Sequence, residues 1–121
     1  MSEVDERALS DRLARGDRSA LAAIYAAHGS VVFAVIVRLV RDRAEAEELV
    51  QETFLEAWRR ATQYQPERAN LAAWLVTIAK SRAIDRLRSR GTSERTLDME
   101  RRDISEPTRG PDDVIDAARA R

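Results

Sequence analysis

The sequence has 121 residues, 44% of them hydrophobic, and its 21 basic residues balance 21 acidic ones, so the formal net charge at pH 7 is zero. This length suits one domain, and a neutral chain has no global field that would attract nucleic acid. The absence of cysteine excludes disulfides, thiol redox chemistry and the usual structural zinc sites, and is compatible with a reducing cytoplasm. The N-terminus is too charged for a signal peptide and the longest apolar run, Val31 to Val37, is far short of a membrane span, so we expect a soluble protein.

The first thirty residues predict two short helices. Val4 to Arg15 can form the first, which Gly16 is expected to end. Asp17 can cap the second, and a Gly-Ser pair at positions 29 and 30 is expected to break it. His28 is the single histidine, and no carboxylate or cysteine stands beside it at ligand spacing, so we read it as an ordinary helix-end residue and predict no metal site.

Ser30 to Arg41 is the most apolar stretch of the chain and is rich in β-branched residues. By propensity alone it could be a buried strand. No second strand-like run exists to pair with it, whereas a helix that is apolar nearly all round fits the centre of a bundle. We therefore expect a central helix.

Asp42 to Trp58 predicts an amphipathic helix that opens with a capping box formed by Asp42 and Glu45. Its core stripe consists of small and apolar residues spaced by three and four: Ala46, Leu49, Val50, Thr53, Phe54, Ala57 and Trp58. The face away from the core carries what we call the acidic ridge: Glu45, Glu48, Gln51, Glu52 and Glu56. Such a ridge is either a solvated face or a docking surface.

A polar loop, Ala61 to Asn70, contains Pro66 and ends where Asn70 can cap a last helix that runs from Leu71 to about Arg90. The first half of that helix has a core-facing stripe: Leu71, Trp74, Leu75, Ile78 and Ala79. The second half is cationic, opposed only by Asp85: Lys80, Arg82, Arg86, Arg88 and Arg90. These cations either stay solvated near the helix C-terminus or neutralise a row of phosphates.

The residues after Gly91 contain Pro107, Gly110 and Pro111 and little apolar material, so we expect a linker. Pro111 could start one further helix through Val114.

The segment ELVQETF, followed at a distance by AAWLVTIAKSRAIDRLRSR, resembles region 2 of bacterial sigma factors of the extracytoplasmic-function group. The resemblance runs from about Asp17 to Arg90. It implies an all-α fold, a compact three- to four-helix bundle with a mostly disordered C-terminal linker. Residues 1–16 would form an N-terminal helical or flexible segment, residues 17–90 would form the region 2 domain, and residues 91–121 would form a linker to a region 4 domain. Region 4 itself is absent here. Either the sequence is a fragment, which we favour, or the protein works without region 4.

The resemblance also implies a function without catalytic chemistry. The domain would dock on the clamp helices of the β′ subunit of core RNA polymerase in the cytoplasm, and would recognise and help melt the minus-ten element of promoter DNA. An anti-sigma factor is a further expected partner, and no cofactor, small-molecule substrate or membrane insertion is expected.

Residue by residue, the resemblance places polymerase contacts at Glu48, Gln51 and Glu52. It places capture of a flipped non-template base on the loop that contains Gln63, Tyr64, Arg68 and Asn70. The upstream edge of the DNA bubble would meet the basic half of the last helix: Lys80, Ser81, Arg82, Asp85, Arg86 and Arg88.

Two departures from the family pattern bear on DNA opening. Ser81 stands where the family often has asparagine, and Leu71 and Leu75 stand where primary sigma factors carry exposed aromatics. Trp74 is expected in the core. Since each stacking aromatic contributes about 1–3 kcal/mol, we expect limited power to melt DNA.

A second interpretation is a helical protein-interaction module without a role on DNA. The placement of charge discriminates between the two interpretations. The DNA-binding interpretation is favoured if the basic half of the last helix and the Tyr64 loop share one face that is separate from the acidic ridge. An enzyme is the weakest option, because the sequence shows no paired catalytic groups and no phosphate-binding loop. For either interpretation we predict one core: Ile24, Val32, Ile36, Leu39, Leu49, Phe54, Trp58, Trp74, Leu75 and Ile78.

Overall fold

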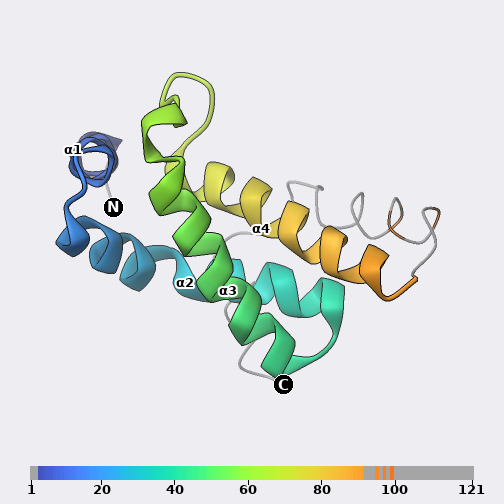
Figure 1. Cartoon of the computed structure of the whole chain (residues 1–121). Coiled ribbons are helices and arrows are strands. Elements are labelled where there is room, and N and C mark those ends of the chain that lie inside the picture. Colours follow the sequence, from blue (N-terminus) through green and yellow to red (C-terminus); the bar gives the residue numbers. More distant parts are fainter. Residues whose placement is uncertain (1–2, 92–94, 96, 98, 100–121) are drawn as a thin grey trace.

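The described residues form an all-α fold in the computed structural model, which places residues 3–91 together with Arg95, Leu97 and Met99. Within this part of the chain there are four α-helices and one 3-10 turn, and no strand (Figure 1). The elements are α1 (Glu3–Ala14), α2 (Arg18–Val40), α3 (Arg43–Arg59), η1 (Ala61–Gln63) and α4 (Leu71–Ser89). The predicted fold class, a helical bundle with a helix rather than a strand at its centre, is confirmed.

Helices α2, α3 and α4 pack against one another, and α1 lies against α2 and η1 (Figure 1). Eight of the ten predicted core residues are buried in a single apolar cluster. The other two, Trp58 and Trp74, are half-buried and pack against that cluster from its edge. The large indole rings thus cover the core instead of filling it.

Three polar side chains begin the helices at the predicted positions. Asp17 accepts a hydrogen bond from the Ser19 N–H, and Asn70 accepts one from the Ala73 N–H at 2.8 Å. Asp42 accepts one from the Glu45 N–H at 2.9 Å. In each case a side-chain oxygen satisfies a first-turn N–H that has no partner within the helix.

The cap at Asp17 also joins α1 to α2. Its carboxylate accepts hydrogen bonds from the Ser19 hydroxyl and from Arg12 Nε of α1, the latter at 2.9 Å. These hydrogen bonds lower the pKa of Asp17 to about 2, the one from the Ser19 hydroxyl contributing most. The end of α1 is thereby tied to the start of the central helix.

α2 is one continuous helix of 23 residues, so the predicted break at Gly29 and Ser30 is wrong. Glycine weakens a helix interior but does not end it, and here Gly29 is buried, with the Tyr25 side chain beside it. His28 therefore lies within the helix and not at its end. The helix ends at Arg41, whose φ of 58° is left-handed and whose N–H donates to the Val37 carbonyl.

Because it is continuous, α2 is long and apolar enough to cross a membrane if length and composition alone are considered, which the short run from Val31 to Val37 did not suggest. The central helix of a bundle meets the same criteria. Many of its side chains, including Ile24, Val32 and Ile36, lie in the apolar core between the other helices. Packing thus accounts for the apolar character of these buried side chains.

The core includes a residue from the segment predicted as linker. Leu97 is helical, fully buried and part of the same apolar cluster. It lies beyond Arg90, where the domain was predicted to end. The further helix predicted from Pro111 lies outside the described residues.

The continuity of α2 generates a prediction. We expect Gly29→Ala to raise the free energy of unfolding by about 0.5–1 kcal/mol, because alanine restricts the unfolded chain and favours the helix. A Cβ at this position would meet the Tyr25 ring at 3.6 Å, an ordinary contact. The matched control is Gly16→Ala, which should be destabilising because Gly16 has a φ of +83°. Urea unfolding measures both, and a loss of stability in Gly29→Ala would contradict the account.

Candidate functional site

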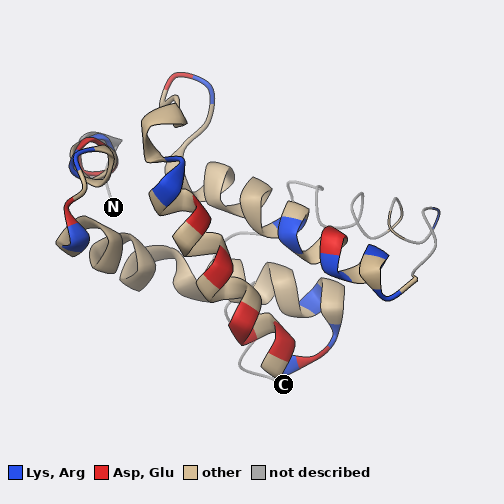
Figure 2. Cartoon of the chain, in the orientation of Figure 1, with Lys and Arg blue, Asp and Glu red and all other residues tan. Residues whose placement is uncertain are grey.

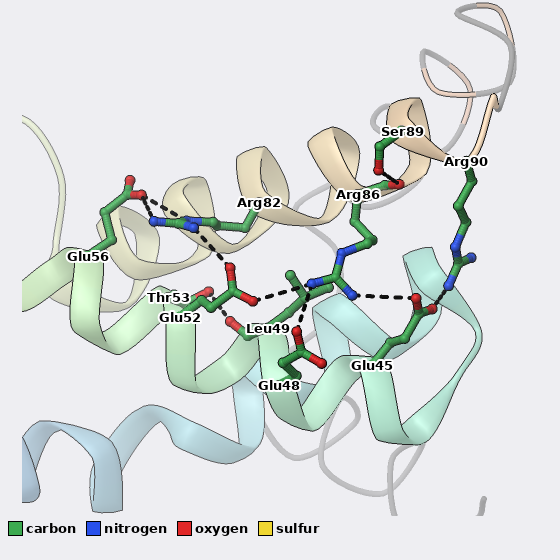
Figure 3. A network of polar contacts seen from close by, with 10 residues as sticks. All are labelled: Glu45, Glu48, Leu49, Glu52, Thr53, Glu56, Arg82, Arg86, Ser89 and Arg90. Carbon is green, nitrogen blue, oxygen red and sulfur yellow. Dashed lines mark hydrogen bonds and ion pairs between the residues drawn. The ribbon is translucent and has the colours of Figure 1, made fainter.

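The acidic ridge of α3 faces the basic half of α4. Figure 2 shows acidic residues along α3 and basic residues on the second half of α4. Between them lies a set of contacts that we call the α3–α4 ion-pair network (Figure 3). Its members are Glu45, Glu48, Glu52 and Glu56 of α3 with Arg82, Arg86 and the capping residue Arg90 of α4.

Arg82 contacts two glutamates of the acidic ridge, Glu52 and Glu56. Its Nη1 donates to Glu52 Oε1 at 3.0 Å, and its Nε donates to Glu56 Oε1 at 2.8 Å. Glu56 also accepts from Arg60 on its own helix at 2.9 Å. Burial alone would raise the pKa of Glu56, but the hydrogen bonds from Arg60 and Arg82 outweigh it, so that pKa lies below its ordinary value.

Arg86 contacts three carboxylates. Its Nη2 lies 3.1 Å from Glu48 and 3.3 Å from Glu52, and its Nη1 lies 3.4 Å from Glu45. One turn further on, Arg90 pairs with Glu45 and donates to the Val40 carbonyl at the end of α2. The network therefore links all three helices of the bundle.

Helical spacing explains why so many pairs form at once. Glu45, Glu48, Glu52 and Glu56 recur at steps of three and four, and so share one face of α3. Arg82, Arg86 and Arg90 recur at steps of four and share one face of α4. When the apolar stripes of the two helices pack together, these two faces meet along the same edge.

This arrangement corrects the predicted placement of charge. The sequence suggested that Asp85 alone opposes the cations and that the ridge, on the face away from the core, is either solvated or a docking surface. In the structure the ridge and the arginines neutralise each other, and Asp85 instead lies 3.8 Å from Arg88 of its own helix. A sequence shows which residues share a helix face, but not which faces of separate helices meet.

The predicted polymerase-binding residues differ in exposure. The Gln51 side chain is exposed, and Glu48 remains 62% exposed in spite of its contact with Arg86. Glu52 is half-buried between Arg82 and Arg86. Gln51 and Glu48 are thus the predicted residues that a partner can reach without breaking the centre of the network.

The predicted DNA-binding residues of α4 divide in the same way. Ser81, Asp85 and Arg88 are exposed, and Lys80 is half-buried. Arg82 and Arg86 contact the acidic ridge directly, beside a polar cleft of about 450 Å³ that Ser81 and Asp85 also line. The structure therefore does not bring all six predicted residues of this helix onto one free surface.

The predicted base-capture loop is held by its own side chains. Tyr64 packs against Trp74 with ring centroids 4.9 Å apart, and its hydroxyl donates to the Ala69 carbonyl at 2.8 Å. Gln63 accepts a hydrogen bond from Arg60 at 3.4 Å, while Asn70 caps α4. The loop is thus braced on both sides before any ligand binds.

A cavity of about 240 Å³ lies between this loop and α1. Tyr64, Arg68 and Asn70 line it from the loop, and Glu6 and Arg7 line it from α1. Burial and the charge of Glu6 raise the pKa of Tyr64. Sequence reasoning missed Glu6 and Arg7, because no signal in the sequence places the N-terminal helix beside a loop more than fifty residues away.

His28 lies near the same cavity. Its Nε2 is 3.9 Å from Glu6 Oε1, and burial lowers the pKa of His28 below its ordinary value of 6.5. Among the described residues, no group of three or more histidines and carboxylates could hold a metal ion.

Comparisons with known proteins agree on one family. The family described as sigma-70 region 2 matches residues 24–92. The chain is 40% identical over 85 residues to the ECF RNA polymerase sigma factor SigK of Mycobacterium ulcerans, covering 70% of this chain and 46% of that protein. It is 39% identical over 84 residues to the SigK of Mycobacterium tuberculosis strain H37Rv, covering 69% and 45%. The chain thus spans less than half the length of these curated relatives.

The α3–α4 ion-pair network generates a stability prediction. We expect Arg86→Met to lower the free energy of unfolding by roughly 1–2 kcal/mol, since it leaves three glutamates without their shared partner. The loss should shrink in 1 M salt, where screening weakens the wild-type network. Arg88→Met is the matched control, because Arg88 is exposed and its 3.8 Å pair with Asp85 lies outside the network. Equal losses in the two variants, measured by urea unfolding, would show that the network does not stabilise the fold.

Proposed function

The chain belongs to the sigma-70 region 2 family, and on this premise we propose that it binds core RNA polymerase and takes part in recognising and opening promoter DNA. The observation that carries the proposal is the extent of the family match. Residues 24–92 include α3, the loop and α4, the three elements to which separate roles are assigned. The relatives it resembles are named as RNA polymerase sigma factors.

We also propose the finer features of this role. The polymerase partner would be the pair of β′ clamp helices, the DNA target the minus-ten element, and the compartment the cytoplasm. An anti-sigma factor would hold the protein inactive. The domain would act by binding alone, without catalysis or a cofactor.

The docking surface for polymerase is proposed on the outer edge of the acidic ridge. Gln51 and Glu48 are exposed there, and Glu52 borders them. An acidic edge suits a basic helical partner, because complementary charge steers the encounter and sets the register of the complex.

The DNA surface is proposed on the outer face of α4 and on the loop. Ser81 and Arg88 are exposed, and Lys80 and Asp85 lie beside them. Arg82 and Arg86 reach DNA only by exchanging a carboxylate partner for a phosphate. We therefore rank Arg88 above Arg82 and Arg86 as a phosphate contact, and assign base capture to the loop that contains Gln63, Tyr64, Arg68 and Asn70.

One observation favours the second candidate, a protein-interaction module. The arginines Arg82 and Arg86 meet the acidic ridge and do not form a separate basic face with the Tyr64 loop. The placement of charge, taken alone, therefore favours a protein-interaction module over a DNA-binding domain. The family match outweighs it, because ion pairs of half-exposed side chains exchange partners at low cost.

The docking proposal predicts that Glu48→Lys with Gln51→Ala weakens binding to core polymerase about tenfold or more. The melting temperature should fall only modestly, because Glu48 is 62% exposed and Arg86 keeps Glu45 and Glu52 as partners. Glu52→Lys is a poor probe, since it would place a cation between Arg82 and Arg86 and destabilise the fold. The control is Glu47→Lys, an exposed position outside the predicted contacts. Unchanged affinity in the double variant, measured in a pull-down with core polymerase, would refute the docking assignment.

The DNA proposal predicts that helix and loop variants differ in kind. Arg88→Ala should weaken binding to all minus-ten oligonucleotides alike and flatten the salt slope by about one unit, because phosphate contacts position without specifying. Arg68→Gln in the loop is compared with Tyr64→Phe, which keeps the ring on Trp74 but removes the brace to Ala69. The loop variants should change the preferred base at one position.

These measurements use holoenzyme built from core polymerase and the full-length protein, with salt titrated against single-stranded oligonucleotides that vary one base at a time. Loop variants that change affinity for every oligonucleotide equally would remove the base-capture role and leave only general electrostatic attraction.

A further inference from the structure

Helix α1 is fixed to the bundle beside the loop. Leu9 and Leu13 bury their side chains in the common core, and Arg12 pairs with the Asp17 cap of α2. α1 also contacts η1, the turn that leads into the loop. The first turns of α1 are therefore held next to the loop (Figure 1).

The cavity between α1 and the loop has a size suited to one base. Its volume of about 240 Å³ lies below the range of roughly 300–1,000 Å³ that is usual for drug-sized ligands. The loop forms one wall through Tyr64, Pro66 and Asn70, and α1 forms the other through Glu6 and Arg7. An extruded base that enters from the loop side would meet α1 on its opposite edge.

Two polar side chains of the loop wall, Tyr64 and Asn70, are committed within the protein, whereas Glu67 and Arg68 of the same wall are exposed. The Tyr64 hydroxyl donates to the Ala69 carbonyl, and the Asn70 Oδ1 accepts from the Ala73 N–H. The α1 wall contributes the carboxylate of Glu6, whose side chain is only 17% exposed. A carboxylate of this kind accepts hydrogen bonds and donates none.

Little else competes for that carboxylate within the described residues. Its ion pair is with His28, at 3.9 Å, longer than a hydrogen bond. Burial lowers the pKa of His28 and so favours its neutral form at pH 7. Glu6 thus keeps its capacity to accept a hydrogen bond from a ligand in the cavity.

We propose that α1 is the second wall of the base-capture pocket and that Glu6 is a specificity-determining residue, favouring an extruded base with an exocyclic amino group over thymine. Cytosine and adenine present such an amino group, which a carboxylate can accept from, whereas thymine presents a carbonyl oxygen at the corresponding position. Arg7, at the cavity, is placed to meet a phosphate that flanks the base. The inference rests on the proposed base capture by the loop and adds the element that reads the base.

The test uses holoenzyme assembled from core polymerase and the full-length protein, and single-stranded minus-ten oligonucleotides that carry cytosine, adenine or thymine at each position in turn. For the wild type we expect one position at which cytosine or adenine binds about tenfold better than thymine. Glu6→Gln should reduce that ratio to within about threefold, because an amide can donate as well as accept. The salt slope should stay unchanged, since no phosphate contact is lost.

Asp5→Asn is the matched control, because it removes the same charge from the neighbouring exposed position of α1 and does not line the cavity. The melting temperature of each variant shows whether α1 remains docked. Retention of the wild-type ratio in Glu6→Gln, or an equal loss in Asp5→Asn, would overturn the role of Glu6 and leave the proposed function intact. A wild type with no base preference at any position would overturn base capture by the loop itself.

Discussion

The ion pairs between α3 and α4 are the interaction on which the proposed binding surfaces depend. They join the helix that carries the proposed polymerase contacts to the helix that carries most of the proposed DNA contacts. Each pair is half-exposed and individually weak, but Arg86 shares three carboxylates, so the pairs hold one another in place. The relative position of the two surfaces is therefore set partly by charge and not by apolar packing alone.

The same network gives several residues two functions. Glu52 belongs to the proposed docking edge and also accepts from Arg82 and Arg86. A substitution there changes the fold and the binding surface together, whereas Gln51 and Arg88 lie on the outside of the bundle. Whether a substitution affects binding alone or also stability therefore depends more on the exposure of the side chain in the folded protein than on its residue type.

The cavity beside Tyr64 shows how a distant segment can complete a site. The loop supplies an aromatic ring and a helix cap, both already engaged, and α1 supplies an acidic side chain from the other end of the sequence. Burial of Leu9 and Leu13 holds α1 in that position. An element that looked like an appendage in the sequence is thus part of the wall of a candidate site.

The sequence by itself determined the helices, their caps at Asp17, Asp42 and Asn70, and most of the buried core, because these depend on local hydrogen bonds and on the spacing of apolar residues along one helix. Its one large local error was the break at Gly29, where tertiary burial outweighed a weak local preference. Only the tertiary structure decided that Arg82 and Arg86 face the acidic ridge, and that Glu6 meets the Tyr64 loop. Both are contacts between helix faces far apart in the chain, and the periodicity of one helix carries no information about which face of another it will meet.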